Sequence, residues 1–193
     1  MRKIEKAIRN PLSALKFLLS IGKGYWYKGK YSILQKDVTI GQNFRVVKGL
    51  RIKGPGKVII GDNVTVDGTT RAVTPYTYSK EAVIRIGSNV FLNGTRFGCS
   101  ILISIGDDCI IGDSSILDTD FHHVDPQKRH SPEPPEAKPI IVERNVWVAG
   151  ATIILKGVTI GENSVVGAGS VVTADIPRNY LALGNPAQVI KKI

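Results

Sequence analysis

Small apolar residues recur at every sixth position in the C-terminal part of the chain. The series runs without a slip through Val142, Val148, Ile154, Ile160, Val166 and Val172. A small or branched residue follows each of them four positions later, from Val146 to Ile176. A period of six does not match the 3.6-residue repeat of an α-helix. Short strands separated by turns do match it, with the same inward position filled again on each side of a coil. The pattern therefore predicts a solenoid.

The same register begins near Asp37 and is interrupted twice. Its earlier turns start at Ile40, Ile60, Ile86 and Ile105. The spacing from Ile86 to Ile105 is 19 residues and that from Ile105 to Val142 is 37, each a multiple of six plus one. A segment must therefore bulge out of the coil in both gaps. The second gap holds an irregular loop at about 118–139, which contains all three histidines and five prolines. Long loops on rigid scaffolds commonly carry function.

Residues 1–36 lack the six-residue register. Asn10 followed by Pro11 predicts a helix start, and Gly22 predicts its end. Between them the leucines share one face, and basic residues surround that face: Lys3, Lys6, Arg9, Lys16, Lys23, Lys28 and Lys30. One interpretation is a cap on the open end of the solenoid. The other is a basic amphipathic segment that rests on an anionic membrane.

The charge and cysteine content of the chain limit the classes of partner and the cellular location that we expect. The 193 residues suit one domain, and the net charge of +10 points to nucleic acid, an anionic membrane face or phosphate-bearing ligands. Basic residues are not interleaved with aromatic ones, which argues against nucleic acid. Cys99 and Cys109 give no disulfide framework, so we expect a reducing, cytoplasmic location. Cys109 lies four residues after Ile105, at an inward position of the six-residue repeat, and is interpreted as a core residue. No stretch is long and apolar enough to span a bilayer, which leaves contact with the inner membrane face as the open alternative.

Four strings in the C-terminal part resemble a known family. They are Asn145–Val148, Gly157–Gly161, Gly167–Thr173 and Gly184–Ala187. Together with the histidine-bearing loop, they resemble the hexapeptide-repeat acyltransferases, in the branch of maltose, galactoside and surface-polysaccharide acetyltransferases. The resemblance covers residues 37–193. It implies an all-β fold, a left-handed parallel β-helix. It also implies a homotrimer that binds acetyl-CoA in the cleft between neighbouring prisms. The short N-terminal helical segment expected in residues 1–36 lies outside the resemblance.

The resemblance also implies roles for residues near the acceptor. His122 matches the family's catalytic histidine, and a neutral imidazole is a suitable general base near neutral pH. Asn93 matches a residue that contacts the acceptor, and we place Asp120 on the same acceptor side. Asp118, Asp120 and Asp125 are all near enough in sequence to orient the imidazole, and the choice among them stays open.

A second group of residues matches the cofactor site of the family. Trp147 should point outward, at the cofactor cleft or a subunit interface. Gly150 and Ala168 match positions where the backbone meets the cofactor, and small residues allow that close approach. Thr173 and Ala174 match positions near the adenine and phosphates, where many relatives carry Thr-Lys. Positions of two family arginines hold Gln188 and Lys191 here, so Arg178, Lys191 and Lys192 are the candidates to bind the 3′-phosphate.

The expected activity is acetyl-CoA-dependent O-acetylation of a sugar hydroxyl in bacterial surface polysaccharide biosynthesis, by direct transfer with His122 as the base. One alternative is an N-acetyltransferase acting on an amino-sugar nucleotide. A non-catalytic trimeric β-helix scaffold is the alternative from another class. No metal is expected, because the related γ-type carbonic anhydrases need three histidines on neighbouring coils and chains, and no histidine precedes His122.

Overall fold

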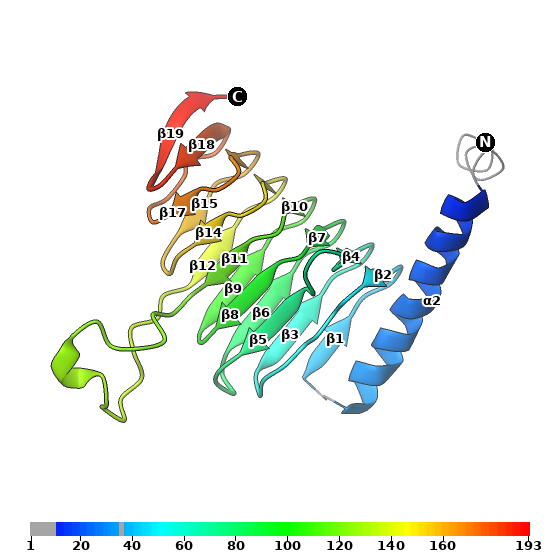
Figure 1. Cartoon of the computed structure of the whole chain (residues 1–193), viewed down its shortest axis with the longest axis horizontal. Coiled ribbons are helices and arrows are strands. Elements are labelled where there is room, and N and C mark those ends of the chain that lie inside the picture. The colour runs from blue at the N-terminus through cyan, green and yellow to red at the C-terminus, as the bar shows by residue number, and fades with distance from the viewer. Residues whose placement is uncertain (1–10, 35–36) are drawn as a thin grey trace.

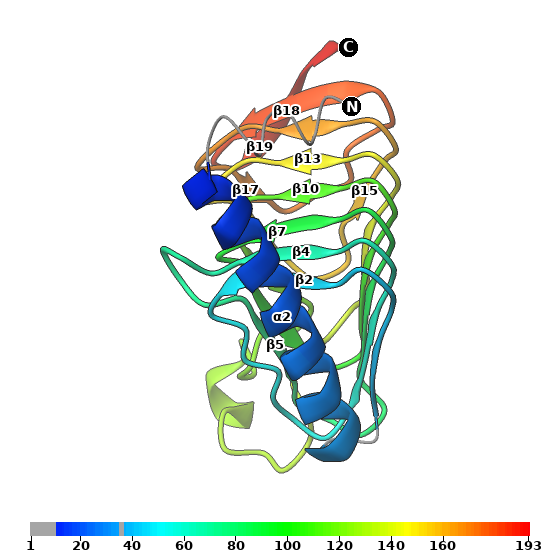
Figure 2. The same ribbon diagram turned by 90° about the vertical axis from the view of Figure 1, so that its right-hand side faces the viewer.

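The computed structural model, which describes residues 11–34 and 37–193, is a column of stacked coils with three sheets as its sides (Figures 1 and 2). Their strands pair in parallel except for the last two of the chain, which are antiparallel. The six-stranded sheet holds β1 (Val38–Ile40), β3 (Lys57–Ile60), β6 (Val83–Ile86), β9 (Leu102–Ile105), β12 (Ile140–Val142) and β15 (Thr159–Ile160). The eight-stranded sheet holds β2 (Arg45–Lys48), β4 (Thr65–Asp67), β7 (Phe91–Asn93), β10 (Ile110–Ile111), β13 (Trp147–Val148), β16 (Val165–Val166), β18 (Tyr180–Gly184) and β19 (Ala187–Lys192). The five-stranded sheet holds β5 (Thr74–Thr77), β8 (Arg96–Cys99), β11 (Ser115–Leu117), β14 (Ile153–Ile154) and β17 (Val171–Val172).

Each coil visits the three sheets in turn, and the strand register explains the irregular spacings. Ile86 pairs with Ile105, and Ile105 pairs with Val142, so each of the two gaps amounts to one coil. The surplus of the second gap is the loop at 118–139, which extends away from the column (Figure 1). Both bulges are thus confirmed. Ile40 pairs with Ile60, 20 residues on, and Ile60 pairs with Ile86, 26 residues on. Two further coils are therefore longer than the regular 18 residues, and the sequence pattern did not predict them.

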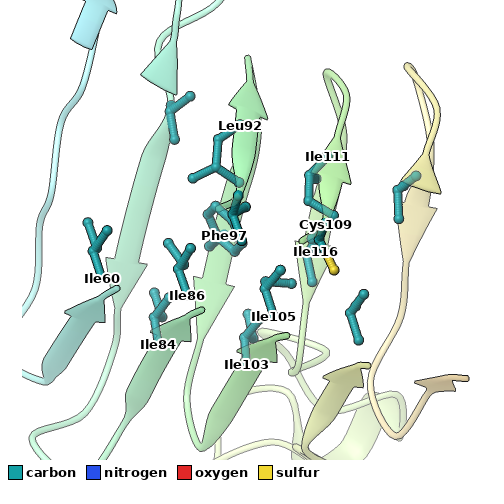
Figure 3. Packing of buried hydrophobic residues seen from close by; sticks show 14 of the residues in the cluster. Ile60, Ile84, Ile86, Leu92, Phe97, Ile103, Ile105, Cys109, Ile111 and Ile116 are labelled. Carbon is teal, nitrogen blue, oxygen red and sulfur yellow. The ribbon is translucent and has the colours of Figure 1, made fainter. Parts of the chain in front are cut away.

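The core is a single stack of inward side chains that runs along the axis of the column (Figure 3). All six residues of the C-terminal series are at most 1% exposed, as the period of six predicts. The second series is buried too, including the hydroxyl residues Thr152, Ser164 and Ser170. Cys109 is fully buried beside Ile111 and Ile116, which confirms it as a core residue.

Burial makes both cysteine thiols unreactive as well as inaccessible to solvent. Burial raises the pKa of the Cys109 thiol to about 11, and it raises the pKa of Cys99 further. A thiol reacts as the thiolate, so its reactivity depends on that pKa. We expect neither cysteine to react with a thiol-specific chromogenic reagent at pH 8 in the folded protein, and both to react in guanidinium. Rapid labelling without denaturant would contradict this prediction.

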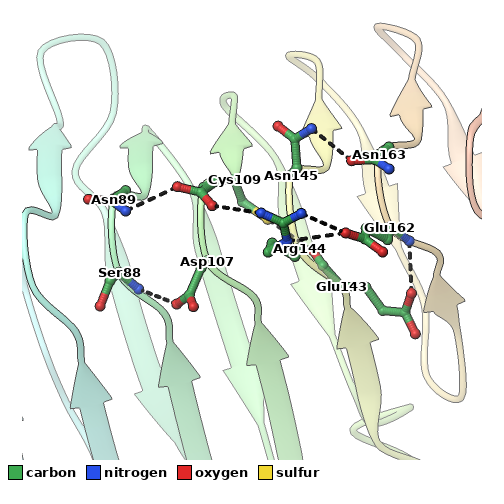
Figure 4. Close-up of polar contacts among 10 residues, drawn as sticks. Ser88, Asn89, Asp107, Cys109, Glu143, Arg144, Asn145, Glu162 and Asn163 are labelled. Atoms are coloured by element: carbon green, nitrogen blue, oxygen red, sulfur yellow. Dashed lines mark hydrogen bonds and ion pairs between the residues drawn. The ribbon is translucent and has the colours of Figure 1, made fainter.

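A ladder of asparagines forms the corner between the six- and eight-stranded sheets, called here the asparagine edge (Figure 4). Its members occupy the left-handed backbone region, which asparagine tolerates better than most residues. Their side chains are hydrogen-bonded from coil to coil: Asn43 to Asn63, Asn63 to Asn89, Asn145 to Asn163 and Asn163 to Asn179. Asp108 takes one place in the ladder, where it accepts from Asn89. The edge thus satisfies turn side chains that would otherwise need water.

Substitution of Asn163 separates the two contributions of this ladder. Asn163 has φ of 61° and bonds both neighbouring asparagines. In Asn163→Gly the left-handed backbone is kept without strain and only the side-chain hydrogen bonds are lost. We expect this to lower the free energy of unfolding by about 1 kcal/mol. In Asn163→Ala the strain of a left-handed residue adds roughly 1–2 kcal/mol. Chemical unfolding of both variants at one protein concentration measures the difference, and equal costs would contradict the account.

The helix α2 (Pro11–Leu34) lies across the first coil, packed against β1 and β2 at one end of the column (Figure 2). Gly24 packs so closely that an added Cβ would meet the carbonyl oxygen of Phe44. Tyr31 is buried, and its hydroxyl accepts a hydrogen bond of 2.9 Å from the amide of Ile52. The predicted stop at Gly22 is wrong, because the helix continues through it for three more turns. The predicted N-cap, Asn10, lies outside the described residues.

Candidate active site

The column has two further corners, and the predicted site residues are divided between them. The corner between the eight- and five-stranded sheets, called here the glycine edge, carries Asn93, Gly150 and Ala168. The corner between the five- and six-stranded sheets, called here the loop edge, carries the loop at 118–139. His122 lies in that loop, and Thr173 and Ala174 lie on the same edge. The whole five-stranded sheet separates the two edges within one chain.

The loop is held at its base by a short clasp. Thr119 and Ala137 form an antiparallel bridge, and the amide of Asp120 donates to the carbonyl of Glu136. Across the clasp, the Lys156 ammonium donates to both carboxylate oxygens of Asp120 at 2.8 Å and lies 3.3 Å from the Glu136 carboxylate. The hydrogen bond to Asp120, more than any other contact, raises the pKa of Lys156. The two arms of the loop are therefore fixed to each other and to the coil.

Asp118 anchors the start of the loop from inside the column. Its side chain is fully buried, and its carboxylate accepts hydrogen bonds of 2.7, 2.8 and 2.9 Å from the amides of Ser100, Ile101 and Leu102. These amides belong to the enlarged corner of the preceding coil, so Asp118 ties that corner to the loop. A carboxylate that accepts three backbone donors is a strong, charge-assisted anchor.

His122 itself projects from this fixed base. The residue is exposed, and among the described residues its ring has no hydrogen-bond partner. Its neighbour Phe121 has φ of 63°, which is unusual for a bulky residue and occurs where the surrounding structure imposes it. The Phe121 ring packs edge-on against Tyr78, with 5.2 Å between ring centroids. The backbone that carries the imidazole is thus held by packing on the outer face of the five-stranded sheet.

The carboxylates proposed to orient His122 have other partners. Asp118 is occupied by the corner amides, and Asp120 by Lys156. Asp125 caps the 3-10 helix η1 (Pro126–Lys128) by accepting from the amide of Gln127 at 2.9 Å. Of the three, Asp118 is the least suited to orient the imidazole, because its buried oxygens accept from the corner amides of the preceding coil. His123 is held by its contact of 3.0 Å with the carbonyl of Glu133, across the two arms of the loop.

A groove beside the loop was not found from the sequence. It has a volume of about 550 Å³ and lies on the outer face of the five-stranded sheet. Its lining includes four aromatic residues, Tyr76, Tyr78, Phe97 and Phe121, and three cationic ones, Arg51, Lys53 and Arg96. Burial raises the pKa of the Tyr78 hydroxyl, which keeps that ring neutral. The lining comes from four separate segments, so only the coiling brings it together.

The glycine edge is open where the cofactor residues were predicted. A Cβ added at Gly150 would meet nothing within 4 Å, so the backbone there is open to an approaching ligand. Ala168 is exposed on the next coil, whose Gly169 amide donates to the Gly150 carbonyl at 3.0 Å. Asn93, at the end of β7 on an earlier coil of the same edge, is half-buried. Trp147, two residues from this edge at the start of β13, points outward with 51% of its surface exposed, as predicted.

Two of the segments proposed for the 3′-phosphate meet in the last hairpin of the chain. Arg178 adjoins Asn179, whose carbonyl accepts from the amide of Ile193 at 2.8 Å, and Lys191 and Lys192 lie on β19 opposite Leu181 and Tyr180. Thr173 and Ala174 lie on the loop edge. In residues 11–34 and 37–193 we find no group of three His, Cys, Asp or Glu side chains that could hold a metal ion. None of the described helices has the length and apolar character needed to cross a membrane.

Comparison with known proteins places this geometry in a family. Residues 139–174 match the family model "Bacterial transferase hexapeptide (six repeats)". The galactoside O-acetyltransferase of Escherichia coli K12 is 37% identical over 138 residues, which are 69% of this chain and 63% of that protein. The chain belongs to the hexapeptide-repeat transferases. A galactoside O-acetyltransferase of Lactococcus lactis is also 37% identical, over 57% of this chain and 53% of its own length. The chain thus spans between about half and two thirds of these curated relatives.

A solved acyltransferase structure shares the fold. The N-acyltransferase AntD from Bacillus cereus, solved with dTDP and 3-hydroxybutyryl-CoA, aligns with a TM-score of 0.67 over 84% of this chain and 87% of its own. Its sequence identity of 22% makes this a likeness of fold alone. The hexapeptide repeat and the three stacked sheets identify the column as a left-handed parallel β-helix, the fold that the resemblance implied.

Proposed function

We propose that this chain is an acetyl-CoA-dependent O-acetyltransferase that acts on a sugar hydroxyl. The observation that carries the proposal is the exposed His122, which has no hydrogen-bond partner in the part of the chain that the structure describes, on a loop fixed beside an aromatic groove. Membership of the family and the similarity to two galactoside O-acetyltransferases support it. The two buried, unpaired cysteines suit a cytoplasmic reaction, and bacterial surface polysaccharide biosynthesis is the pathway we favour.

In the proposed reaction the acceptor hydroxyl attacks the thioester carbonyl of acetyl-CoA directly. The His122 imidazole takes the hydroxyl proton as the new C–O bond forms. The tetrahedral intermediate then collapses, the C–S bond breaks, and the imidazolium returns the proton to the thiolate of CoA. Backbone amides near Trp147 and Gly150 are the candidates to stabilise the oxyanion. No acyl-enzyme forms, and the two substrates must be bound at the same time.

We further propose that the complete site lies between two copies of the chain. A single chain holds His122 on the loop edge but Asn93, Gly150 and Ala168 on the glycine edge. The loop edge of one copy facing the glycine edge of the next unites them, and in a ring of three copies it does so three times. Phe91, Ile110 and Trp147 are register neighbours on the outer face of the eight-stranded sheet, 37%, 50% and 51% exposed. Such an apolar stripe is typical of a contact between subunits.

The groove gives the acceptor a chemical character. Its aromatic rings offer large, flat contact surfaces for a sugar ring, and its three cations suit a phosphate or carboxylate. We therefore favour an acidic or phosphate-bearing sugar as the acceptor. Arg96→Ala should raise KM for such an acceptor without raising KM for acetyl-CoA, and KM for a neutral sugar should change little.

The cationic groove also supports a second candidate function, the N-acetylation of an amino-sugar nucleotide. A sugar nucleotide carries the diphosphate that Arg51, Lys53 and Arg96 would bind. The chemical nature of the product separates the two functions, since an acetyl ester is cleaved by mild alkali and an amide is not.

Release of CoA thiol from acetyl-CoA tests the proposal. The chain is incubated with a panel of neutral sugars, acidic sugars and amino-sugar nucleotides, and the acetylated product is treated with alkali. We expect CoA release with a sugar acceptor and an alkali-labile product. An alkali-stable product would favour the amide instead. No CoA release with any acceptor, and no binding of acetyl-CoA, would leave the scaffold alternative.

A further inference from the structure

We infer that the outward face of α2 binds an anionic lipid bilayer. The inward face is already used, since Ser20, Gly24 and Tyr31 are buried against the first coil. With 3.6 residues per turn, Leu15, Leu19, Trp26 and Ile33 fall together on roughly the opposite face. Their exposed fractions are 53%, 54%, 59% and 82%. Leu12, Leu18 and Tyr25 widen this outward apolar face, and each is more than half exposed.

The charges on the helix select the partner. Between Pro11 and Leu34 there are four lysines and no acidic residue. Lys16, Lys23 and Lys30 recur every seven residues, so they form a row along one border of the outward apolar face. Within this row Lys23 donates to the carbonyl of Val47 at 2.7 Å, and Lys28, on the other flank, donates to the carbonyl of Gly41 at 3.1 Å. Lys16 and Lys30 donate no hydrogen bond to the column among the described residues. An apolar face bordered by lysines, with Trp26 and Tyr25 among the apolar residues, matches helices that lie in the interface of an anionic membrane.

The place of the helix in the fold favours a membrane over a second copy of the chain. The helix covers the end of the column (Figure 2), while the proposed contacts between copies use the sides of the column. In a threefold ring of parallel columns, all three helices would lie at the same end. Three weak lipid contacts would then act together, which multiplies the overall affinity. This last step rests on the proposed trimer; the apolar face and its lysines do not.

Flotation of the whole protein with lipid vesicles tests the inference. Wild type should float with vesicles of phosphatidylcholine and phosphatidylglycerol, and much less with phosphatidylcholine alone or at high salt. The variant Leu15→Gln, Leu19→Gln, Ile33→Gln should lose about a hundredfold in partition, because three large side chains no longer enter the bilayer. The matched control Val124→Gln, Ile190→Gln, Ile193→Gln changes three apolar residues that are 79%, 52% and 53% exposed away from the helix, and should bind as wild type.

Quenching of tryptophan fluorescence by lipid gives a second measurement of membrane contact. The main variant leaves the apolar face of the helix intact, and only the control variant changes it. In Trp147→Phe the only tryptophan is Trp26, and lipids brominated along the acyl chain should quench its fluorescence. In Trp26→Phe the remaining Trp147 should not be quenched. Failure of wild type to float with anionic vesicles, or equal losses in the helix variant and its control, would overturn the inference. So would an apolar-face variant that changes the oligomeric mass but not the flotation, which would assign the face to a second copy.

Discussion

Replacing His122 by alanine should lower kcat by about a hundredfold to ten-thousandfold, the usual contribution of a positioned general base. KM for acetyl-CoA should change little, because the imidazole acts on the acceptor proton. The free energy of unfolding should also be unchanged, since His122 is exposed and has no hydrogen-bond partner among the described residues. Steady-state kinetics and chemical unfolding of the same preparation measure both quantities.

The adjacent histidine provides the matched control. His123 contacts the carbonyl of Glu133 across the loop and is placed away from the proton transfer in our account. His123→Ala should retain most of kcat. Equal losses in the two variants would mean that loop conformation, rather than base catalysis, is being measured, and full activity of His122→Ala would contradict the mechanism.

Replacing Asp118 by alanine should cost about 4 kcal/mol or more of stability, the largest effect we expect from any single substitution in the loop. The change removes the acceptor of the amides of Ser100, Ile101 and Leu102. Hydrogen bonds to charged groups contribute about 1.5–3 kcal/mol each, and an unpaired donor adds its own desolvation cost. Asp118→Asn should be only partly better, because its amide nitrogen donates where the backbone already donates.

Asp125→Ala is the control for this second prediction. Asp125 is exposed and its carboxylate caps η1 by one hydrogen bond to Gln127, so its loss should cost about 1 kcal/mol. Denaturant unfolding at one fixed protein concentration compares the variants, because association also contributes to apparent stability. Similar small costs for both carboxylates would show that Asp118 is not the anchor.

The sequence predicted what depends on local period. The inward residues from Val142 to Val172, the outward Trp147 and the two bulges follow from a step of six, because every sixth residue meets the same kind of environment. The prediction that the helix ends at Gly22 was wrong because tertiary contacts extend the helix. Glycine costs about 1 kcal/mol inside a helix, but packing of Tyr31 on the first coil lies beyond Gly22 and carries the helix past it.

What the sequence could not predict depends on contacts between coils. Asp118 looks like any loop carboxylate until the preceding coil brings three amides to it. The groove joins Arg51 to Tyr76 and Phe121, which only stacking makes neighbours. The match of Asn93 and His122 to one family site gave no hint that a single chain separates them by a whole sheet. That separation is what makes the subunit contact central to the account.

Activity of mixed trimers tests this central claim most directly. Chains carrying His122→Ala are coexpressed with chains carrying Gly150→Trp, a change that fills the open surface at the glycine edge, and heterotrimers are isolated with two different tags. If the loop edge of one copy meets the glycine edge of the next, every heterotrimer contains one interface with both residues intact. The account predicts about one third of wild-type kcat from two inactive parents. Mixed trimers as inactive as the parents would contradict it.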